Sequence, residues 1–367
     1  MNVLVHGIGN NFTGGVENFI INYFRNIDKS KIQFDFVCYN NKPAFYDELI
    51  EQGSHVYIIT GRRKNYFKCY NQMKKIFLEK KYDAVWANVC SLSDILIIKF
   101  AYIFKIKKRI VHAHNSSVKS WFTITGILHK INKRKIMKYG TDFWTCSQKA
   151  SQFMFPSDAT KSDKYKIIRN AIDTKRFEFN KEIRLQKRKE LIIDNKIIIG
   201  HIGRFHIQKN HKFLLEIFKE ICKKKRDVIL LLVGTGELLE QIKNQAKLLE
   251  IEEKVYFYGT STNIPKLLNA MDVFLFPSYY EGLPIVLVEA QATGLGCIIS
   301  DVITPEVIIT DNVYPVSLKE SAETWADLVI EKVNNERKNK YSCIKDNGYD
   351  IHTESKFLEK YFLEDNN

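Results

Sequence analysis

Several features that would mark a secreted, membrane-spanning or zinc-stabilised protein are missing from the sequence. Its seven cysteines are scattered, with no CxxC pair and no cluster with histidine. That distribution argues against a disulfide framework and a structural zinc site, and it is typical of a reducing cytoplasm. No segment approaches the roughly 18 apolar residues that span a bilayer, because Lys99 and Lys105 interrupt the longest apolar stretch, residues 95–106. The first residues, MNVLVHGIG, lack the charged start and cleavage site of a signal peptide. We therefore expect a cytoplasmic protein.

The chain has no low-complexity tract, and its 367 residues are enough for two domains with separate cores. Short β-branched or apolar segments alternate with longer amphipathic ones throughout. Strands are expected at residues 2–6, 34–39, 55–59, 84–87, 109–113, 142–146, 197–202, 228–233, 254–258, 273–276 and 296–300. Helical segments between the strands predict a parallel sheet covered on both faces, and this pattern occurs twice.

We therefore expect an α/β protein with two Rossmann-like domains, residues 1–175 and residues 176–350. The turn-rich stretch RNAIDTKRF marks the change from one to the other. Because ligands of open α/β sheets bind at the carboxyl ends of the strands, the two sheets should share one cleft. Residues 351–367 contain a last helix, which either returns toward the first domain or caps the second.

Positive charge is concentrated in the first half of the chain. Residues 1–175 hold 29 Lys and Arg against 13 Asp and Glu, whereas residues 176–367 hold 27 against 29. A lysine-rich genome would not place the whole excess in one half. We expect the first domain to face something anionic, either a phospholipid surface or nucleic acid.

The segment PSYYEGLPIVLVEAQATG follows a buried strand and leads into a helix. Gly282, Leu283 and Pro284 form a turn just before that helix, which presents Glu281 and free backbone N–H groups at the helix amino terminus. Anions and sugar hydroxyls bind readily at such a position. Glu289 lies in the first turns of the helix, so its carboxylate can reach the same site. Two carboxylates at this spacing suit sugar and ribose hydroxyls, although an ordinary turn with solvated acids has the same pattern.

Two further loops carry ligand-binding patterns. Arg204 and Lys209 follow the strand that ends in GHIG, where a guanidinium and an ammonium can both turn toward a diphosphate; taken alone, such residues are more often solvated. Gly14 and Gly15 follow the first strand and allow the backbone to approach a bound ligand closely. GxGxxG is broken there, and the strand FDFVCYN ends without the acidic residue that would hold a nicotinamide ribose.

Taken together, the motifs resemble those of the large retaining glycosyltransferase family 4. They stand in family order and cover essentially the whole chain. The matching segments are TGGVE at 13–17, IVHAHNS at 110–116, RNAIDTKRF at 169–177, GRFHIQKNH at 203–211, LLVGTGE at 231–237, VYFYGTSTNIPKLLNAMDVFLFPS at 255–278 and EGLPIVLVE at 281–289. The resemblance implies the GT-B fold, in which two Rossmann-like domains face each other across a cleft.

The resemblance also implies roles for individual residues. Glu289 would hold the ribose hydroxyls of a nucleotide sugar, and Glu281 with the turn after it would orient the donor sugar. Arg204 and Lys209 would stabilise the departing diphosphate in place of a metal. No DxD stands at a strand end as a metal bridge, so we expect neither a metal nor another cofactor.

His112 and His114 follow the strand KRIV. An HxH pair can bind metal, but no convincing third ligand accompanies this one, and a buried core histidine is the commoner explanation for either residue. By resemblance, His114 lies near the donor sugar and the acceptor. We expect His112 to point the other way, into the core.

Residues 119–139 interleave apolar and basic side chains, and residues 97–109 repeat the pattern. An apolar stripe beside a basic face fits a helix that lies in a bilayer interface, where each basic residue contributes about 1 kcal/mol. A core helix with a solvated face gives the same pattern. The residues expected to face a membrane are Lys119, Trp121, Phe122, Lys130, Lys133, Arg134 and Lys135.

We therefore expect a retaining glycosyltransferase that moves a sugar from a nucleotide sugar, more often a UDP-sugar, to a polyprenyl-diphosphate-linked saccharide. The setting would be bacterial capsule, exopolysaccharide or O-antigen synthesis on the inner face of the plasma membrane. One alternative is a soluble transferase that acts on a free sugar, a glucan or a small metabolite. Another is a non-catalytic nucleic-acid-binding protein, which would leave the motif at 281–289 without a purpose.

Overall fold

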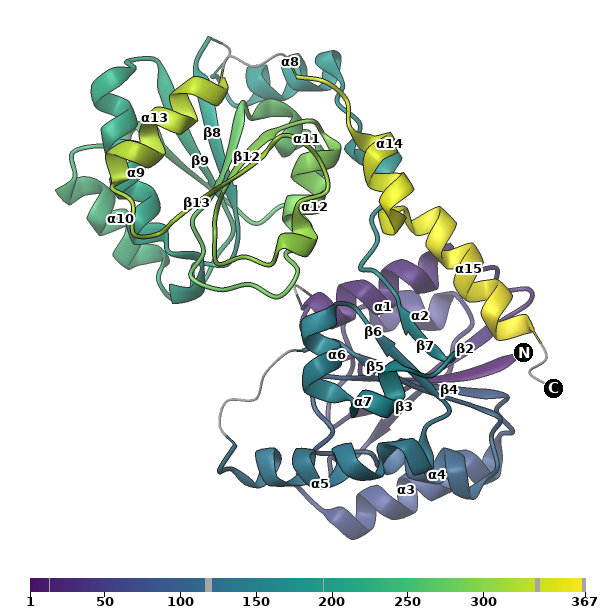
Figure 1. Ribbon diagram of the computed structural model, residues 1–367. Coiled ribbons are helices and arrows are strands. Elements are labelled where there is room, and N and C mark those ends of the chain that lie inside the picture. Colours follow the sequence, from purple (N-terminus) through teal and green to yellow (C-terminus); the bar gives the residue numbers. More distant parts are fainter. Residues whose placement is uncertain (13, 116–120, 194, 334–336, 365–367) are drawn as a thin grey trace. The chain divides into compact units, whose positions relative to one another are not determined.

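The structure is a computed structural model that describes residues 1–12, 14–115, 121–193, 195–333 and 337–364 (Figure 1). The chain forms two compact units. The first comprises Met1–Ala171 together with Ile351–Asn367, and the second comprises Ile172–Asp350. The chain thus leaves the first unit after Ala171 rather than after residue 175, and it returns to that unit for its last helix.

The first unit is built on a parallel sheet of seven strands in the order β3-β2-β1-β4-β5-β6-β7. The strands are β1 (Asn2–His6), β2 (Gln33–Tyr39), β3 (Val56–Ile59), β4 (Ala84–Val89), β5 (Lys108–Ala113), β6 (Asp142–Thr145) and β7 (Tyr165–Ile167). After β1, the strands β2 and β3 are added on one side of it. The chain then crosses to the other side of β1, where β4, β5, β6 and β7 are added in turn. That reversal leaves a topological switch point between β1 and β4, the usual place for a ligand in an open α/β sheet.

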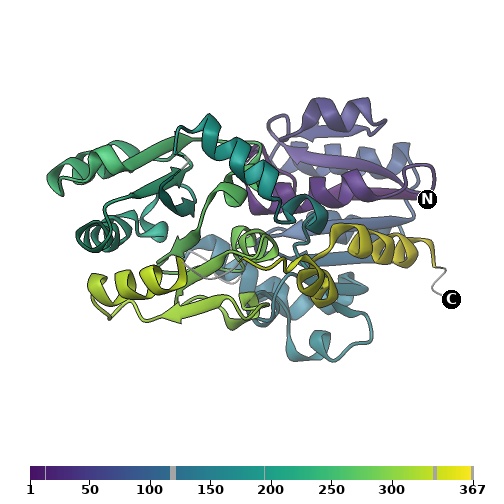
Figure 2. The same cartoon turned by 90° about the horizontal axis from the view of Figure 1, so that it is seen from above.

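Helices cover both faces of this sheet (Figure 1). They are α1 (Gly15–Asn26), α2 (Tyr46–Glu51), α3 (Tyr66–Glu79), α4 (Leu96–Ile103), α5 (Ile124–Tyr139), α6 (Gln148–Met154), α7 (Ser157–Thr160) and α15 (Ile351–Leu363). Alternation along β1 divides the core. Val3 and Val5 pack toward α1 and α15, whereas Leu4 packs toward α3 and α4. The last helix, α15, lies beside α1 (Figures 1 and 2).

The second unit repeats the architecture with six parallel strands in the order β10-β9-β8-β11-β12-β13. They are β8 (Ile197–Ile202), β9 (Val228–Val233), β10 (Val255–Gly259), β11 (Val273–Phe276), β12 (Gly296–Ser300) and β13 (Val313–Val316). The helices are α8 (Lys181–Glu190), α9 (His211–Lys224), α10 (Leu239–Leu248), α11 (Ile264–Ala270), α12 (Ile285–Ala292), α13 (Ala322–Val333) and α14 (Tyr341–Ile344). The central strands are apolar on both faces because helices bury both sides of the sheet.

Residues 97–109 are partly exposed and partly buried: Ile103, Lys105 and Lys107 are exposed. Within α4, Ile97, Ile98 and Phe100 are buried. Lys108 is buried too, and its ammonium donates hydrogen bonds of 2.7 and 2.6 Å to the carbonyls of Tyr361 and Phe362. A cation at this point satisfies the carbonyl end of α15 and complements its dipole. The buried side of α4 fits the alternative of a core helix with a solvated face, and the bilayer interface for this stretch stays a prediction.

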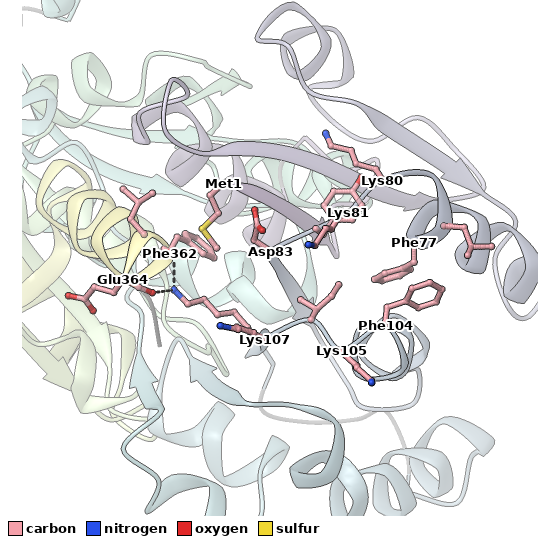
Figure 3. Close-up of a pocket in the computed structure, with 15 residues that line it drawn as sticks. Met1, Phe77, Lys80, Lys81, Asp83, Phe104, Lys105, Lys107, Phe362 and Glu364 are labelled. Carbon is pink, nitrogen blue, oxygen red and sulfur yellow. Dashed lines mark hydrogen bonds between the residues drawn. The ribbon is translucent and has the colours of Figure 1, made fainter. Parts of the chain in front are cut away.

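A cavity of about 620 Å³ lies beside Lys108. Met1, Asp83 and Lys107 are among the residues that line it (Figure 3). These residues precede or begin strands, so the cavity lies at the amino edge of the first sheet, away from the edge at which α/β sheets bind their ligands. Among the described helices of both units, none is long and apolar enough to cross a membrane.

Candidate active site

In the second unit, β8 and β11 are neighbours at the point where the strand order reverses. The loop after β8 carries Arg204 and Lys209, and the loop after β11 carries Glu281. Parallel strands bring their carboxyl ends to one edge, so both loops meet above the switch point of the sheet. This is where a ligand of a Rossmann-like domain is expected.

An ion pair joins the two loops. The Nζ of Lys209 lies 2.7 Å from Oε1 of Glu281, and the two side chains are only 15% and 7% exposed. Gln208 adds three contacts: its Nε2 donates to Oε2 of Glu281 at 3.0 Å and to the Tyr280 carbonyl at 2.8 Å, and its own carbonyl accepts from the Tyr279 N–H at 2.9 Å. Glu281 is therefore held on both carboxylate oxygens.

The turn after Glu281 adds further donors. No group in the described part of the chain accepts a hydrogen bond from the backbone N–H of Gly282 or Leu283. Helix α12 starts directly after, and no side chain caps its amino terminus. Free N–H groups at a helix amino terminus bind anions or sugar hydroxyls. An ammonium, a carboxylate and free N–H groups thus converge at one sheet edge, which suits a ligand that has both phosphate and hydroxyl groups.

Arg204 is directed away from the Lys209–Glu281 ion pair. Its Nη2 lies 3.0 Å from Oε2 of Glu237, in the loop after β9, and the side chains are 68% and 48% exposed. His206 approaches the same carboxylate at 3.6 Å. An ion pair this exposed contributes little to stability, so the guanidinium can exchange Glu237 for a phosphate at small cost. The predicted Arg204 and Lys209 thus share one loop but have separate partners.

A glycine lets the loops after β8 and β9 meet. Gly234 has a φ of +144°, and a Cβ placed there would lie 2.1 Å from the carbonyl oxygen of Gly203. Any other residue would force the two backbones apart. In the same place, the Gly203 N–H donates to the carbonyl of Val233 at 2.9 Å. The position of the Arg204 backbone is therefore fixed by the close approach of these loops.

Glu289 lies on α12 and is only partly exposed. Among the residues that the structure describes, nothing forms a hydrogen bond with its carboxyl group. Burial raises the pKa of Glu289 to about 8, against a smaller opposite effect of Arg176. The side chain is therefore largely protonated near neutral pH. A ligand whose hydroxyls donate to it would favour the ionised form.

In the first unit, the glycine-containing loop after β1 contacts the carboxylate of Glu17, a residue to which the sequence analysis gave no role. Glu17 accepts a hydrogen bond of 3.1 Å from the Gly9 N–H, and a Cβ on Gly14 would lie 2.0 Å from its other carboxylate oxygen. A Cβ on Gly15 would meet nothing within 4 Å. Gly14 thus makes room for Glu17, whereas Gly15 has the open face that a ligand could approach.

His114 lies just beyond the end of β5. One ring nitrogen, Nε2, is 2.8 Å from Oδ1 of Asn88, whose Nδ2 donates to the His6 carbonyl at 3.2 Å. Because that second bond fixes the amide, we assign the proton to Nε2 of His114 and leave Nδ1 as an acceptor. Burial lowers the pKa of His114 to about 3, so the ring is neutral at physiological pH.

His112 is fully buried and accepts a hydrogen bond of 3.2 Å from the Trp86 indole N–H. However, the centroids of its ring and the His114 ring are only 4.2 Å apart. The prediction that the two rings point opposite ways is wrong, because residues two apart in a strand share a face. No group of three or more His, Cys, Asp or Glu side chains that could hold a metal occurs within the described ranges.

Helix α5 turns apolar side chains outward. Ile124 is 77% exposed and Ile127 50% exposed, and Phe122 just before the helix is 95% exposed. Its polar residues face inward instead: His129 accepts from the Leu92 N–H at 3.1 Å. An amphipathic helix of a globular protein normally has the reverse arrangement. The outer face of α5 is therefore an exposed apolar surface.

Basic residues flank this surface. Lys130, Arg134 and Lys135 are exposed, and the Lys130 ammonium lies 5.1 Å from the ring centroid of Trp121, itself 42% exposed. Contrary to expectation, Lys133 points inward and donates to two carbonyls of α6 at 2.7 and 2.9 Å. The predicted Lys119 lies outside the described residues.

Sequence reasoning missed the residues that hold the predicted ones in place. They are Gln208 beside Glu281, Glu237 beside Arg204, Asn88 beside His114, and Glu17 inside the glycine loop. Glu17 and Gln208 lie within the quoted motifs and could have been found there. Glu237 also ends a quoted motif, LLVGTGE at 231–237. Asn88 lies outside the quoted motifs, and only its position near the carboxyl end of β4 would have drawn attention.

A family model described as "Glycosyl transferases group 1" matches residues 182–350. A putative glycosyltransferase of Bacillus subtilis, EpsF, is 33% identical over 332 residues, which cover 89% of this chain and 86% of EpsF. A galactosyltransferase of Escherichia coli, named for UDP-Gal and α-D-GlcNAc-diphosphoundecaprenol, is 33% identical over 145 residues, 38% of this chain and 37% of that protein.

Solved structures share the architecture. HepE of Anabaena in complex with UDP has a TM-score of 0.78 at 18% identity, covering 98% of this chain and 99% of that one. Two Rossmann-like units with this likeness show the GT-B fold, which confirms the predicted fold class. The chain belongs to the group 1 glycosyl transferases.

Proposed function

We propose that the protein transfers a sugar from a UDP-sugar, with retention at the anomeric carbon, to a polyprenyl-diphosphate-linked saccharide. The reaction serves the synthesis of a bacterial surface polysaccharide on the inner face of the plasma membrane, and it needs no metal ion. The observation that carries the donor assignment is the ion pair between Lys209 and Glu281, beside the free N–H groups of the turn.

Each group of the donor has a partner in the second unit. The Lys209 ammonium has three N–H donors and needs only one for Glu281, so it can also bind a diphosphate oxygen. Arg204 reaches the diphosphate by leaving its exposed pair with Glu237. Glu289 accepts from ribose hydroxyls, and Glu281 accepts from hydroxyls of the sugar. UDP as the carrier is supported by the HepE complex and by the name of the E. coli relative.

Retention follows if the acceptor hydroxyl attacks the anomeric carbon from the same face of the sugar from which the diphosphate departs. The acceptor hydroxyl forms its bond to the anomeric carbon while the bond to the diphosphate breaks, and its proton passes to the departing phosphate oxygen. Lys209 and Arg204 stabilise the charge that develops there. Glu281 is engaged on both oxygens, which suits orientation of the sugar rather than nucleophilic attack. His114, neutral and with Nδ1 as an acceptor, orients a hydroxyl of the donor or the acceptor.

The acceptor assignment has two supports. The E. coli relative is named for a saccharide on a diphosphoundecaprenol. Helix α5 exposes Ile124 and Ile127 beside Lys130 and Arg134, in the half of the chain that has the positive excess. Apolar and basic side chains on one exposed face favour an anionic membrane surface, where a polyprenyl acceptor resides.

A donor screen followed by a transfer assay tests the proposal. UDP- and GDP-sugars are first ranked by the rise in melting temperature, because a ligand that binds only the folded state stabilises it. The best donor is then incubated with a polyprenyl-diphosphate saccharide or with the free saccharide, and the anomeric configuration of the product is read by NMR. Transfer with retention to the lipid-linked saccharide is expected. Transfer only to the free saccharide, or inversion, would refute the acceptor or the stereochemistry.

A further inference from the structure

A second cavity of the first unit lies among α3, α4 and α5, which cover the same side of the sheet (Figure 1). Its volume is about 180 Å³, and most of its lining is aromatic or aliphatic. Tyr66 and Tyr70 come from α3, Ile103 from α4 and Leu128 from α5. At about 30 Å³ per water, the space equals about six waters, which is enough for a short hydrocarbon segment.

Two cations line the same cavity. The ammonium of Lys99 forms no hydrogen bond or ion pair within the described part of the chain, and it lies 5.6 Å from the ring centroid of Tyr139. Arg62 has one long ion pair, 3.4 Å from Nη1 to Oδ1 of Asp94, with both side chains about one quarter exposed at 27% and 26%. An apolar cavity with two available cations suits a ligand that joins a hydrocarbon to an anion.

Asp94 connects this cavity to a polar one. Its other oxygen, Oδ2, accepts a hydrogen bond of 3.3 Å from the Tyr39 hydroxyl. Tyr39 lines a cavity of about 230 Å³ at the carboxyl ends of β1 and β2, together with His6, Glu17 and Asn41. An aromatic ring and several hydrogen-bonding groups in a space this small suit one saccharide ring. Apolar, cationic and polar surfaces therefore follow one another within a single compact unit.

The apolar cavity also continues outward. Tyr66 and Ile103 on its rim are 48% and 59% exposed. Phe67 beside them on α3 is 79% exposed, and Ile124 and Ile127 on α5 extend the exposed apolar surface. A hydrocarbon chain that leaves the cavity on this side would stay in contact with apolar side chains rather than with water.

We propose that the cavity among α3, α4 and α5 binds the isoprene units next to the diphosphate of the acceptor, an inference that rests on the function proposed above. Lys99 and Arg62 bind the diphosphate. The saccharide reaches the cavity beside Tyr39. The protein thus presents an apolar, a cationic and a polar surface in turn, and a lipid-linked saccharide has a hydrocarbon, a diphosphate and a sugar in the same order. A membrane phospholipid has a hydrocarbon and a phosphate but no saccharide to occupy the polar cavity.

Two variants and two matched controls test the assignment. Ile103→Asp places a charge on the rim of the cavity, and Lys99→Gln removes one of its cations. Leu78→Asp, at a site that is 66% exposed, and Lys74→Gln make the same changes on α3 outside this cavity. Steady-state KM is measured without vesicles for one saccharide diphosphate carrying either a water-soluble triprenyl chain or a methyl group. The melting shift with UDP-sugar verifies the fold of each variant.

Ile103→Asp is expected to raise the ratio of KM for the prenyl acceptor to KM for the methyl acceptor by about tenfold or more. Lys99→Gln should raise both KM values by about tenfold, the effect of losing one charge-assisted contact. Both controls should match the wild type. The inference is wrong if Ile103→Asp has the same ratio as Leu78→Asp. It is also wrong if the variants lose sedimentation with phosphatidylglycerol vesicles while both KM values stay unchanged, because the surface would then bind bulk lipid only.

Failure of the function itself gives a different result. Wild-type protein that uses neither diphosphate acceptor but glycosylates the diphosphate-free saccharide would refute the proposed acceptor class, irrespective of the variants.

Discussion

Replacing Glu289 with glutamine should separate donor binding from the protonation of this side chain. Burial raises the pKa of Glu289 from its usual value of 4.5 to about 8 in the ligand-free protein. The folded state therefore keeps a proton that the unfolded chain releases. The contribution of this protonated carboxyl group to the free energy of unfolding is fully present below about pH 4.5, and it is lost as the pH rises through about 8. The difference between these two pKa values corresponds to at most about 5 kcal/mol of free energy of unfolding. Partial exposure of the Glu289 side chain reduces this figure.

The same shift couples donor affinity to pH. A nucleotide sugar whose ribose hydroxyls donate to the ionised carboxylate must first displace the proton from Glu289. Donor affinity of the wild type should rise by up to about tenfold per pH unit toward pH 8 and then level off. In Glu289→Gln the affinity should be weaker and independent of pH. At pH 9 this ligand-free variant should melt at a higher temperature than the wild type, because glutamine brings no buried charge.

Calorimetric titration with UDP-sugar from pH 6 to 9, and melting curves over the same range, measure both effects. The diphosphate diester of a UDP-sugar does not titrate in this range and its uracil begins to ionise only near pH 9, so the slope of donor affinity against pH below pH 8 belongs to the protein. Glu240→Gln is the matched control, since this carboxylate is 77% exposed and lies on α10. It should keep the slope of the wild type. Equal slopes in the wild type and Glu289→Gln would refute the reasoning, and so would a lower melting temperature of Glu289→Gln at pH 9.

Other predictions follow from the geometry of the site. Lys209→Met should lower kcat/KM by about 100-fold or more and also lower the melting temperature, because Glu281 is left mostly buried without its cation; unchanged activity in steady-state assays would contradict its role. Arg204→Gln should cause a similar loss of activity with stability within about 0.5 kcal/mol in urea titrations, since its ion pair is exposed. His114→Gln should lower kcat without changing the shape of its pH profile from pH 5 to 8, because the pKa near 3 keeps the ring neutral; a lost ionisation step would disprove this. Gly234→Ala should destabilise the second unit by about 2 kcal/mol or more in urea titrations, and near-wild-type stability would show that the loops can separate. Transfer should continue in excess EDTA, and its abolition, with rescue by a divalent cation, would refute metal independence.

The central strands were predictable because their sequences are continuous apolar runs between polar boundaries. The structure has strands with the expected bounds at Asn2–His6, Ile197–Ile202, Val228–Val233, Val273–Phe276 and Gly296–Ser300. Two edge strands were missed. β7 (Tyr165–Ile167) has three residues, and β13 (Val313–Val316) contains Pro315, which only an edge position tolerates because proline has no N–H for the ladder.

The positions of the loops that carry Arg204, Lys209 and Glu281 were predictable for a related reason. Strand ends fix where a loop begins, and Arg204, Lys209 and Glu281 each follow a strand with clear bounds. Which charges pair was not predictable. Lys209 and Glu281 are 72 residues apart in the chain, and their 2.7 Å contact depends on β8 and β11 being neighbours in the sheet.

Helix α5 shows most directly what the sequence and the fold each decided. The sequence alone determined that residues 124–139 form a helix carrying both apolar and basic side chains. Tertiary structure decided which face is buried: His129 and Asn132 hydrogen bond to the backbone of Leu92, and Lys133 to the carbonyls of α6. Burying polar groups requires such partners, and they come from other elements of the fold. Ile124 and Ile127 are exposed for that reason, although their residue type alone would place them in the core.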